Sequence, residues 1–167
     1  DTTSTLRDPP YHLIVIGGGP IGVDMAHAHR RLGCKVTVVE GAKVLGRDDP
    51  ELAAVVTAQL QAEGISLIEG QGVVRLSGGP GAVEVTLADG RQVTGSHILM
   101  AVGRKVALDG LNLDAAGIAH TPKGVTVNAS LRSSNRRGYA VGDAAGGLQV
   151  THVAGWHAGI VIRQIVL

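Results

Sequence analysis

The sequence LIVIGGGPIG, residues 13–22, joins a short apolar run to a cluster of glycines. The run at 13–16 is too short for a helix and is closed by glycine, which predicts a buried strand. From 20 to 32, apolar or small residues recur every three or four positions, which predicts a helix with Pro20 in its first turn. Strand, glycine turn and helix together form the beginning of a βαβ unit.

The glycines of this turn fit the pattern G-x-G-x-x-G at Gly17, Gly19 and Gly22. In this context the first glycine permits the tight turn, the second lets a pyrophosphate approach the backbone, and the third lets helix and strand pack closely. Free N–H groups at the helix start then face the anion. A plain turn is the alternative, but it rarely needs three glycines. We therefore predict a dinucleotide-binding loop. Its residues are Gly17, Gly18, Gly19, Pro20, Ile21 and Gly22.

A second β-branched run at 35–40 completes the unit and ends at Glu40, eighteen positions after Gly22. A dinucleotide fold places there the carboxylate that accepts hydrogen bonds from the adenine ribose. Because a carboxylate repels a 2′-phosphate, Glu40 favours NAD over NADP. Lys43 and Arg47 follow closely in the sequence, so binding of that phosphate by a cation stays open as an alternative.

The remaining pattern alternates between buried strands, helices and short paired strands. Asp48-Asp49-Pro50-Glu51 has the chemistry of a helix N-cap, and the helix is expected to stop at Gly64. Its predicted apolar stripe is Leu52, Val55, Val56 and Leu60. Glycine-rich turns then separate short strands, which predicts an antiparallel meander. The predicted meander strands lie at 73–76, 83–87 and 91–93. A third strand of the first kind is predicted at 65–68, a further buried strand at 97–102 and a last helix at 151–165.

Composition excludes several classes of protein. Of the 167 residues, 44% are hydrophobic, 17% are charged and 2% are aromatic, which is typical of a parallel sheet buried under helices on both faces. The formal net charge of +1 argues against a nucleic-acid-binding tail or a polybasic membrane segment. Cys34 is the single cysteine, which excludes an internal disulfide and a cysteine-rich zinc site. No apolar run approaches the roughly 20 residues of a membrane span, and we expect a cytoplasmic protein.

These patterns predict an α/β fold. We expect a Rossmann-like, three-layer NAD(P)-binding domain at 1–96 that includes the antiparallel meander. No Ser-His-Asp arrangement, carboxylate pair or metal-ligand spacing stands out in the sequence. The sequence therefore predicts a binding site with no catalytic residue and no metal.

Several further segments match one family in order along the chain. The matching segments are IGGGPIG at 16–22, GCKVTVVE at 33–40, AVGR at 101–104, DGL at 109–111, YAVGDAAG at 139–146 and THVAGWHAG at 151–159. The chain resembles the flavin-dependent pyridine nucleotide–disulfide oxidoreductases, and within them dihydrolipoamide dehydrogenase and mercuric reductase-like proteins. This resemblance implies that 97–167 contain the end of the NAD domain and a returning segment of the FAD domain with its terminal helix.

The resemblance also implies roles for individual residues. Val73 would lie by the adenine, Gly103 would approach the nicotinamide, and Asp143 would bind the ribityl chain of the flavin. Asp24 stands where the family usually has Glu, near the meeting point of nicotinamide and flavin. Alternatively, Asp24 is a first-turn acid that the helix dipole favours. The residues expected near the isoalloxazine are Gln149, Val150, Thr151, His152 and Ala154.

As a member of this family, the chain would be the NAD(H)-binding part of an enzyme that passes hydride from NADH to FAD and on to a disulfide or related acceptor. FAD would bind only in the full-length parent. An NADH oxidase or ferredoxin reductase-like flavoprotein, or a non-catalytic NAD-sensing domain, are the alternatives.

Three parts of the family pattern do not occur in the sequence: an earlier flavin-binding glycine motif, a redox-active cysteine pair and a C-terminal interface domain. We therefore expect an excised middle segment that is inactive alone. Its expected partners are NAD(H), the rest of the parent flavoprotein and a second copy of the chain, bound through the apolar final helix.

Overall fold

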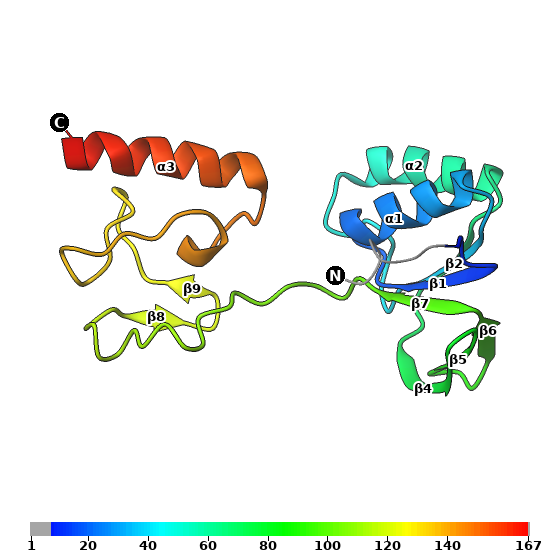
Figure 1. The fold of residues 1–167 in the computed structure, drawn as a ribbon. Coiled ribbons are helices and arrows are strands. Elements are labelled where there is room, and N and C mark those ends of the chain that lie inside the picture. Colours follow the sequence, from blue (N-terminus) through cyan, green and yellow to red (C-terminus); the bar gives the residue numbers. More distant parts are fainter. Residues whose placement is uncertain (1–7, 167) are drawn as a thin grey trace. The chain divides into compact units, whose positions relative to one another are not determined.

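The structure is a computed structural model that describes residues 8–166. The chain divides into two compact units between Gly103 and Arg104. The first unit contains the glycine-rich loop, and the second contains the terminal helix. Each unit is described by itself (Figure 1).

A parallel sheet of four strands forms the centre of the first unit. Its strands are β1 (His12–Ile16), β2 (Lys35–Val39), β3 (Ser66–Ile68) and β7 (His97–Met100). They are ordered β3-β2-β1-β7, and every pair is parallel. The glycine-rich loop therefore leaves the sheet from an inner strand, with β2 on one side and β7 on the other.

Two helices cover one face of this sheet (Figure 1). Helix α1 (Pro20–Arg31) has Pro20 in its first turn, and Gly33 adopts a φ of 91° just beyond its C-terminus. Helix α2 (Pro50–Ala62) is capped by Asp49, whose side chain accepts hydrogen bonds from the N–H groups of Glu51 and Leu52. Both helices confirm the boundaries expected from proline, N-cap and glycine signals.

An antiparallel sheet covers the opposite face (Figure 1). Its strands are β4 (Val73–Gly79), β5 (Ala82–Leu87) and β6 (Gln92–Gly95), paired in sequence order as the predicted meander. The unit is therefore three layers thick. The composition had suggested helices on both faces of the parallel sheet, which is wrong, because the second face is covered by the meander.

The alternation of side chains along β1 explains these two coverings. Leu13 and Val15 point into a core shared with the helices, whereas Ile14 and Ile16 point into a core shared with the meander. All four side chains are buried. A strand buried on both faces reads as a continuous apolar run rather than an alternating one, which is the pattern of β1.

The predicted apolar stripe of α2 is only partly correct. Leu60 is buried, but the side chains of Leu52 and Val55 are 68% and 69% exposed. Thr57 and Ala53, about one and two turns before Leu60, are half-buried instead. The face of α2 that packs against the helix-side core therefore contains Ala53 and Leu60 rather than the whole predicted stripe.

The second unit contains little regular structure apart from its last helix. It has a short hairpin of β8 (His120–Thr121) and β9 (Gly124–Val125), the 3₁₀ helix η2 (Gly142–Ala145) and helix α3 (Thr151–Val166). No residue of α3 that the structure describes is fully buried. Within residues 8–166, no helix combines the length and the hydropathy that crossing a membrane requires.

Candidate nucleotide site

The glycine-rich loop is shaped by two close backbone approaches. Gly17 has a φ of 106°, and a Cβ there would overlap the carbonyl oxygen of Ala101, which follows β7. A Cβ on Gly22 would overlap the carbonyl oxygen of Gly17. These contacts explain why the turn and the first turn of α1 both require glycine.

The beginning of α1 is open to an anion. Gly19 is the N-cap residue of α1. Because glycine has no side chain, no side-chain hydrogen bond caps the helix start. Nothing lies within 4 Å of where a Cβ on Gly19 would stand. Because the first N–H groups of a helix have no intrahelical acceptor, they remain available to a phosphate at this position. The adjacent Ile21 is half exposed.

The carboxylate of Glu40 is held against this loop. Its Oε2 accepts a hydrogen bond from the N–H of Gly18 at 2.7 Å, and its Oε1 accepts one from the N–H of Ala42 at 2.9 Å. A carboxylate has about four lone-pair sites, so two hydrogen bonds leave acceptor capacity for hydroxyl groups. Glu40 thus lies beside the glycine-rich loop at the end of β2, and the sequence did not indicate the two backbone donors that orient it.

The loop at 41–46 is fastened to the glycine-rich loop by backbone contacts. The N–H of Leu45 donates to the carbonyl oxygen of Gly18 at 2.8 Å. Glu69 accepts a hydrogen bond from the N–H of Val44 at 2.7 Å through its Oε1. Val44 and Leu45 also bury their side chains in the helix-side core. Neither Glu69 nor Leu45 was identified from the sequence as part of the site.

Other predicted residues of the first unit lie around this centre. Val73 begins β4, and the neighbouring Gly72 has its Cα 4.0 Å from a Cβ placed on Gly41. Gly103 has a φ of 115° with open space beside its Cα. Asp24 is exposed on α1, but the first turn of α1 contains no acidic residue. Its interpretation as a first-turn acid is therefore wrong, because the helix begins at Pro20 and Asp24 lies in the second turn.

Asp143 and its neighbours form a separate group in the second unit. The Oδ2 atom of Asp143 lies 3.9 Å from Nη1 of Arg104, and both side chains are about half exposed. Arg104 also donates a hydrogen bond to the carbonyl oxygen of Gln149. Arg104, Lys105, Val106, Ala107, Asp143 and Ala144 line an open pocket of about 460 Å³.

Helix α3 is attached to this group through its first turns. The N–H of Gly142 donates to Nδ1 of His157 at 3.1 Å. Gly142 also packs so closely on Ala154 that a Cβ there would lie 2.8 Å from the Cβ of Ala154. The other predicted flavin-side residues are half-buried or exposed at the start of α3 or just before it. They are Gln149, Val150, Thr151 and His152.

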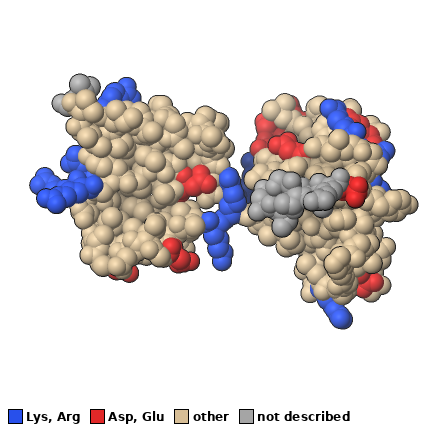
Figure 2. Space-filling model, viewed as in Figure 1, with Lys and Arg blue, Asp and Glu red and all other residues tan. Residues whose placement is uncertain are grey.

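Charged groups are dispersed over both units. Figure 2 shows Lys and Arg interspersed with Asp and Glu on the face in view, with uncharged surface between them. Among residues 8–166, no three His, Cys, Asp or Glu side chains are grouped so that they could hold a metal ion. The glycine-rich loop and the start of α1 instead offer uncapped backbone N–H groups to an anionic ligand.

Comparison with known proteins identifies the relationship. A sequence profile of the family described as pyridine nucleotide-disulphide oxidoreductase matches residues 2–158. The chain belongs to this family. Its ordered motifs had predicted this membership, which is confirmed.

Dihydrolipoyl dehydrogenase of Bacillus subtilis is 34% identical over 166 residues, which cover 94% of this chain and 34% of that protein. Mercuric reductase of Streptomyces lividans is 31% identical over 172 residues, which cover 96% of this chain and 35% of that protein. The structure of the HOCl-induced flavoprotein disulfide reductase RclA from Escherichia coli matches with a TM-score of 0.90 at 32% identity, over 96% of this chain and 37% of that chain. The chain thus spans about a third of the length of these family members.

Proposed function

We propose that this chain is the NAD(H)-binding segment of a flavoprotein disulfide oxidoreductase that passes hydride from NADH to FAD and on to a disulfide or related acceptor. The observation that carries the proposal is the position of Glu40. Its carboxylate is oriented by the N–H of Gly18, in the same loop that leads to the open start of α1. A ribose and a pyrophosphate are adjacent groups in a dinucleotide, so one ligand would satisfy both features.

The residues of the first unit fit NAD. The N–H groups at the start of α1 would bind the pyrophosphate, and the open space beside Gly19 would admit its oxygens. The free lone pairs of Glu40 would accept the ribose hydroxyls. Gly72 and Val73 lie beside the loop that follows Glu40, which supports Val73 as a neighbour of the adenine. The chemistry of hydride transfer is supplied by the bound cofactors, and the protein supplies orientation and electrostatics.

The second unit has side chains suited to a flavin. The carboxylate of Asp143 is half exposed and can accept hydrogen bonds from ribityl hydroxyls. Contact of η2 with Ala154 and His157 keeps Asp143 close to the start of α3. We therefore propose that FAD binds here in the parent protein. This second group also favours a reductase over a domain that only senses NAD, because such a domain has no use for a flavin half-site.

The final acceptor is determined outside this segment. Relatives named dihydrolipoyl dehydrogenase and mercuric reductase match the same part of the chain with nearly equal identity. Because this segment is shared by enzymes named for different substrates, its residues do not distinguish dihydrolipoamide from mercuric ion as the acceptor. The THVA sequence at 151–154 favours the disulfide reductases over an NADH oxidase or ferredoxin reductase-like enzyme.

Titration calorimetry tests the proposal directly. NADH and NADPH are titrated separately into the 167-residue chain, and we expect measurable binding of NADH that is tighter than that of NADPH. A chain that is folded by circular dichroism yet binds neither dinucleotide would overturn the proposal. Tighter binding of NADPH would overturn the role of Glu40 and would point to Lys43 or Arg47.

Self-association is a separate part of the proposal. The apolar side chains of Trp156, Ile162 and Ile165 on α3 are each at least 60% exposed. Exposed apolar surface of this kind favours contact with a second copy. Sedimentation equilibrium at increasing concentration is expected to show a dimer, and a monomer at the highest concentration would count against it. A cytoplasmic location likewise stays a prediction.

A further inference from the structure

Glu69 lies beside Glu40 at one edge of the parallel sheet. Strands β2 and β3 pair in register, with Val39 opposite Ile68, so each glutamate immediately follows a paired residue. Glu69 accepts the N–H of Val44 at 2.7 Å, and Glu40 accepts the N–H of Ala42 at 2.9 Å. Two carboxylates therefore hold the same loop through amides two residues apart.

The residue after Val44 connects the 41–46 loop to the glycine-rich loop. Leu45 donates its N–H to the carbonyl oxygen of Gly18 at 2.8 Å. Leu45 also has a φ of 53°, a left-handed conformation that is unfavourable for leucine. Neighbouring contacts must hold it there. The hydrogen bond between Glu69 and Val44 fixes the residue that directly precedes Leu45.

We propose that Glu69 is a positioning and specificity residue of the dinucleotide site. It fixes the 41–46 loop so that Glu40 stays oriented toward the ribose, and its negative charge adds to that of Glu40 against a 2′-phosphate. This inference rests on the proposed binding of NAD(H).

The two roles of Glu69 are separable by substitution. Glu69→Gln keeps an oxygen that accepts the N–H of Val44 but removes the charge, whereas Glu69→Ala removes both. Loss of the hydrogen bond is expected to raise the Kd for NADH about 3- to 10-fold in Glu69→Ala. In Glu69→Gln the Kd for NADH should stay within about twofold, while the Kd for NADPH falls by about two- to threefold at low salt and less at high salt.

The experiment is a titration of NADH and NADPH into the wild-type chain and both variants at low and high salt. Glu84→Gln is the matched control, because Glu84 lies on β5, where its carboxylate accepts from Gln92 at 3.1 Å. That control removes the same charge from the same unit and should change neither Kd. Amide hydrogen exchange of Val44 in the unliganded chain provides a second readout. Exchange should accelerate in Glu69→Ala but not in Glu69→Gln.

The outcomes separate this inference from the proposed function. If wild type binds NADH and Glu69→Ala binds it equally well, or the Val44 amide exchanges at an unchanged rate, the positioning role is wrong and NAD binding stands. If Glu69→Gln leaves the Kd for NADPH unchanged, or changes both Kd values equally, the charge of Glu69 does not discriminate between the dinucleotides and the specificity role is wrong. If wild type binds neither dinucleotide, the proposed function fails and this inference fails with it.

Discussion

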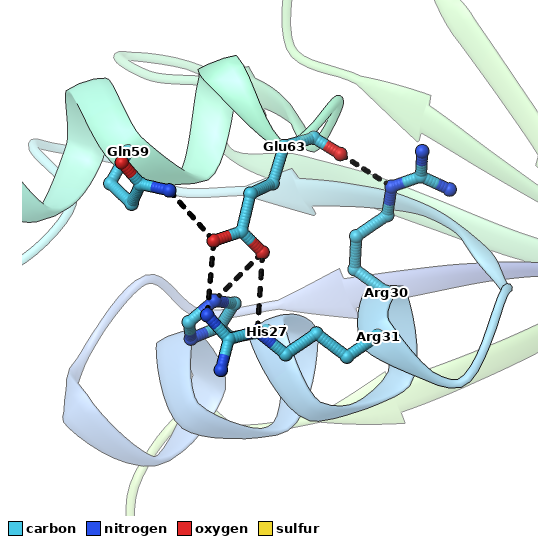
Figure 3. Close-up of polar contacts among 5 residues, drawn as sticks. All are labelled: His27, Arg30, Arg31, Gln59 and Glu63. Carbon is cyan, nitrogen blue, oxygen red and sulfur yellow. Dashed lines mark hydrogen bonds and ion pairs between the residues drawn. The ribbon is translucent and has the colours of Figure 1, made fainter.

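Glu63, just after α2, accepts a hydrogen bond from Nε2 of His27 on α1 at 2.9 Å (Figure 3). The same carboxylate accepts from Arg31 at 3.1 Å and from Gln59 at 2.8 Å. The backbone carbonyl of Glu63 also accepts from Nε of Arg30 at 2.6 Å. The ends of the two helices that cover the sheet are thus joined through one residue.

These contacts predict an acid-sensitive connection between the helices. Arg31, with Gln59 and His27, lowers the pKa of the Glu63 carboxyl from 4.5 to about 2. The ionised form therefore stabilises the fold above pH 4.5, and this contribution is lost as the pH falls from there toward 2. Glu63→Gln is expected to lower Tm at pH 7 by no more than a few degrees, because exposed ion pairs are screened by solvent.

The measurement is thermal unfolding of wild type and Glu63→Gln between pH 3 and pH 7. The difference in Tm should shrink toward pH 3, because below pH 4.5 the unfolded chain takes up a proton on Glu63 that the native carboxylate, with a pKa of about 2, does not. Glu51→Gln is a suitable control, because Glu51 is an exposed acid at the other end of α2. A difference in Tm that is the same at every pH would show that the charge of Glu63 does not act.

His12 gives a second pH dependence, near neutrality. It is buried at the start of β1, and its Nε2 lies 2.9 Å from Oγ1 of Thr37. Burial, followed by the positive charge of Lys35, lowers the pKa of His12 below 6.5. The unfolded chain therefore binds more protons than the native state below that pH, and the free energy of unfolding falls as the pH falls.

Urea unfolding at pH 5.0, 6.0 and 7.5 measures this effect. The wild-type midpoint should fall from pH 7.5 to pH 5.0, and His12→Gln should show a smaller fall because glutamine does not titrate. Parallel curves for wild type and variant would assign the acid sensitivity to other groups. His29→Gln is the control, because His29 is only half-buried on α1.

Much of the first unit could be predicted from the sequence because its signals are local. The apolar run of β1, the glycines after it and Asp49 before α2 each act through their immediate neighbours, and their elements lie where expected. The covering of the sheet could not be predicted in this way. Whether a helix or a meander covers Ile14 depends on contacts between residues distant in sequence, and composition alone suggested helices.

The site was predicted less completely than the fold. Gly17, Gly22 and Glu40 were identifiable because a motif fixes their spacing, and the structure brings them to one loop region. The donors at Ala42 and Val44 are backbone groups, which carry no sequence signal. Glu69 did carry a weak one, since an acid directly after a parallel strand lies at the edge where Glu40 lies.

Glu40 provides the sharpest test of cofactor choice. A charge-assisted hydrogen bond contributes roughly 1.5–3 kcal/mol, so Glu40→Ala should weaken NADH binding by about one to two decades and bring NADPH closer to parity. Glu40→Arg should shift the preference toward NADPH, because a guanidinium binds a phosphate in two places. The structure adds a limit: neither variant can accept the N–H groups of Gly18 and Ala42. Absolute affinity for NADPH should therefore gain little.

Calorimetric titration of both dinucleotides into wild type, Glu40→Ala and Glu40→Arg measures these changes. Glu40→Gln is the matched control, because its side-chain oxygen still accepts one of the two backbone hydrogen bonds. An unchanged ratio of the two Kd values in Glu40→Arg would mean that the carboxylate does not face the 2′-position of the ribose.

Gly19→Asp should lower the affinity for NADH without lowering the stability of the fold. The backbone of Gly19 has φ −74° and ψ 177°, which other residues adopt readily, and nothing lies within 4 Å of the position of a Cβ on Gly19. Aspartate is a favoured N-cap residue, so the variant should be as stable as wild type or a few tenths of a kcal/mol more stable. Its carboxylate would also accept hydrogen bonds from the N–H groups at the start of α1 and repel a pyrophosphate, so NADH affinity should fall by at least about two decades.

Tm and the Kd for NADH are measured on the same preparations, with Gly19→Ala as a control that adds a methyl group without charge. A variant that keeps its affinity for NADH would show that the pyrophosphate does not lie at the start of α1.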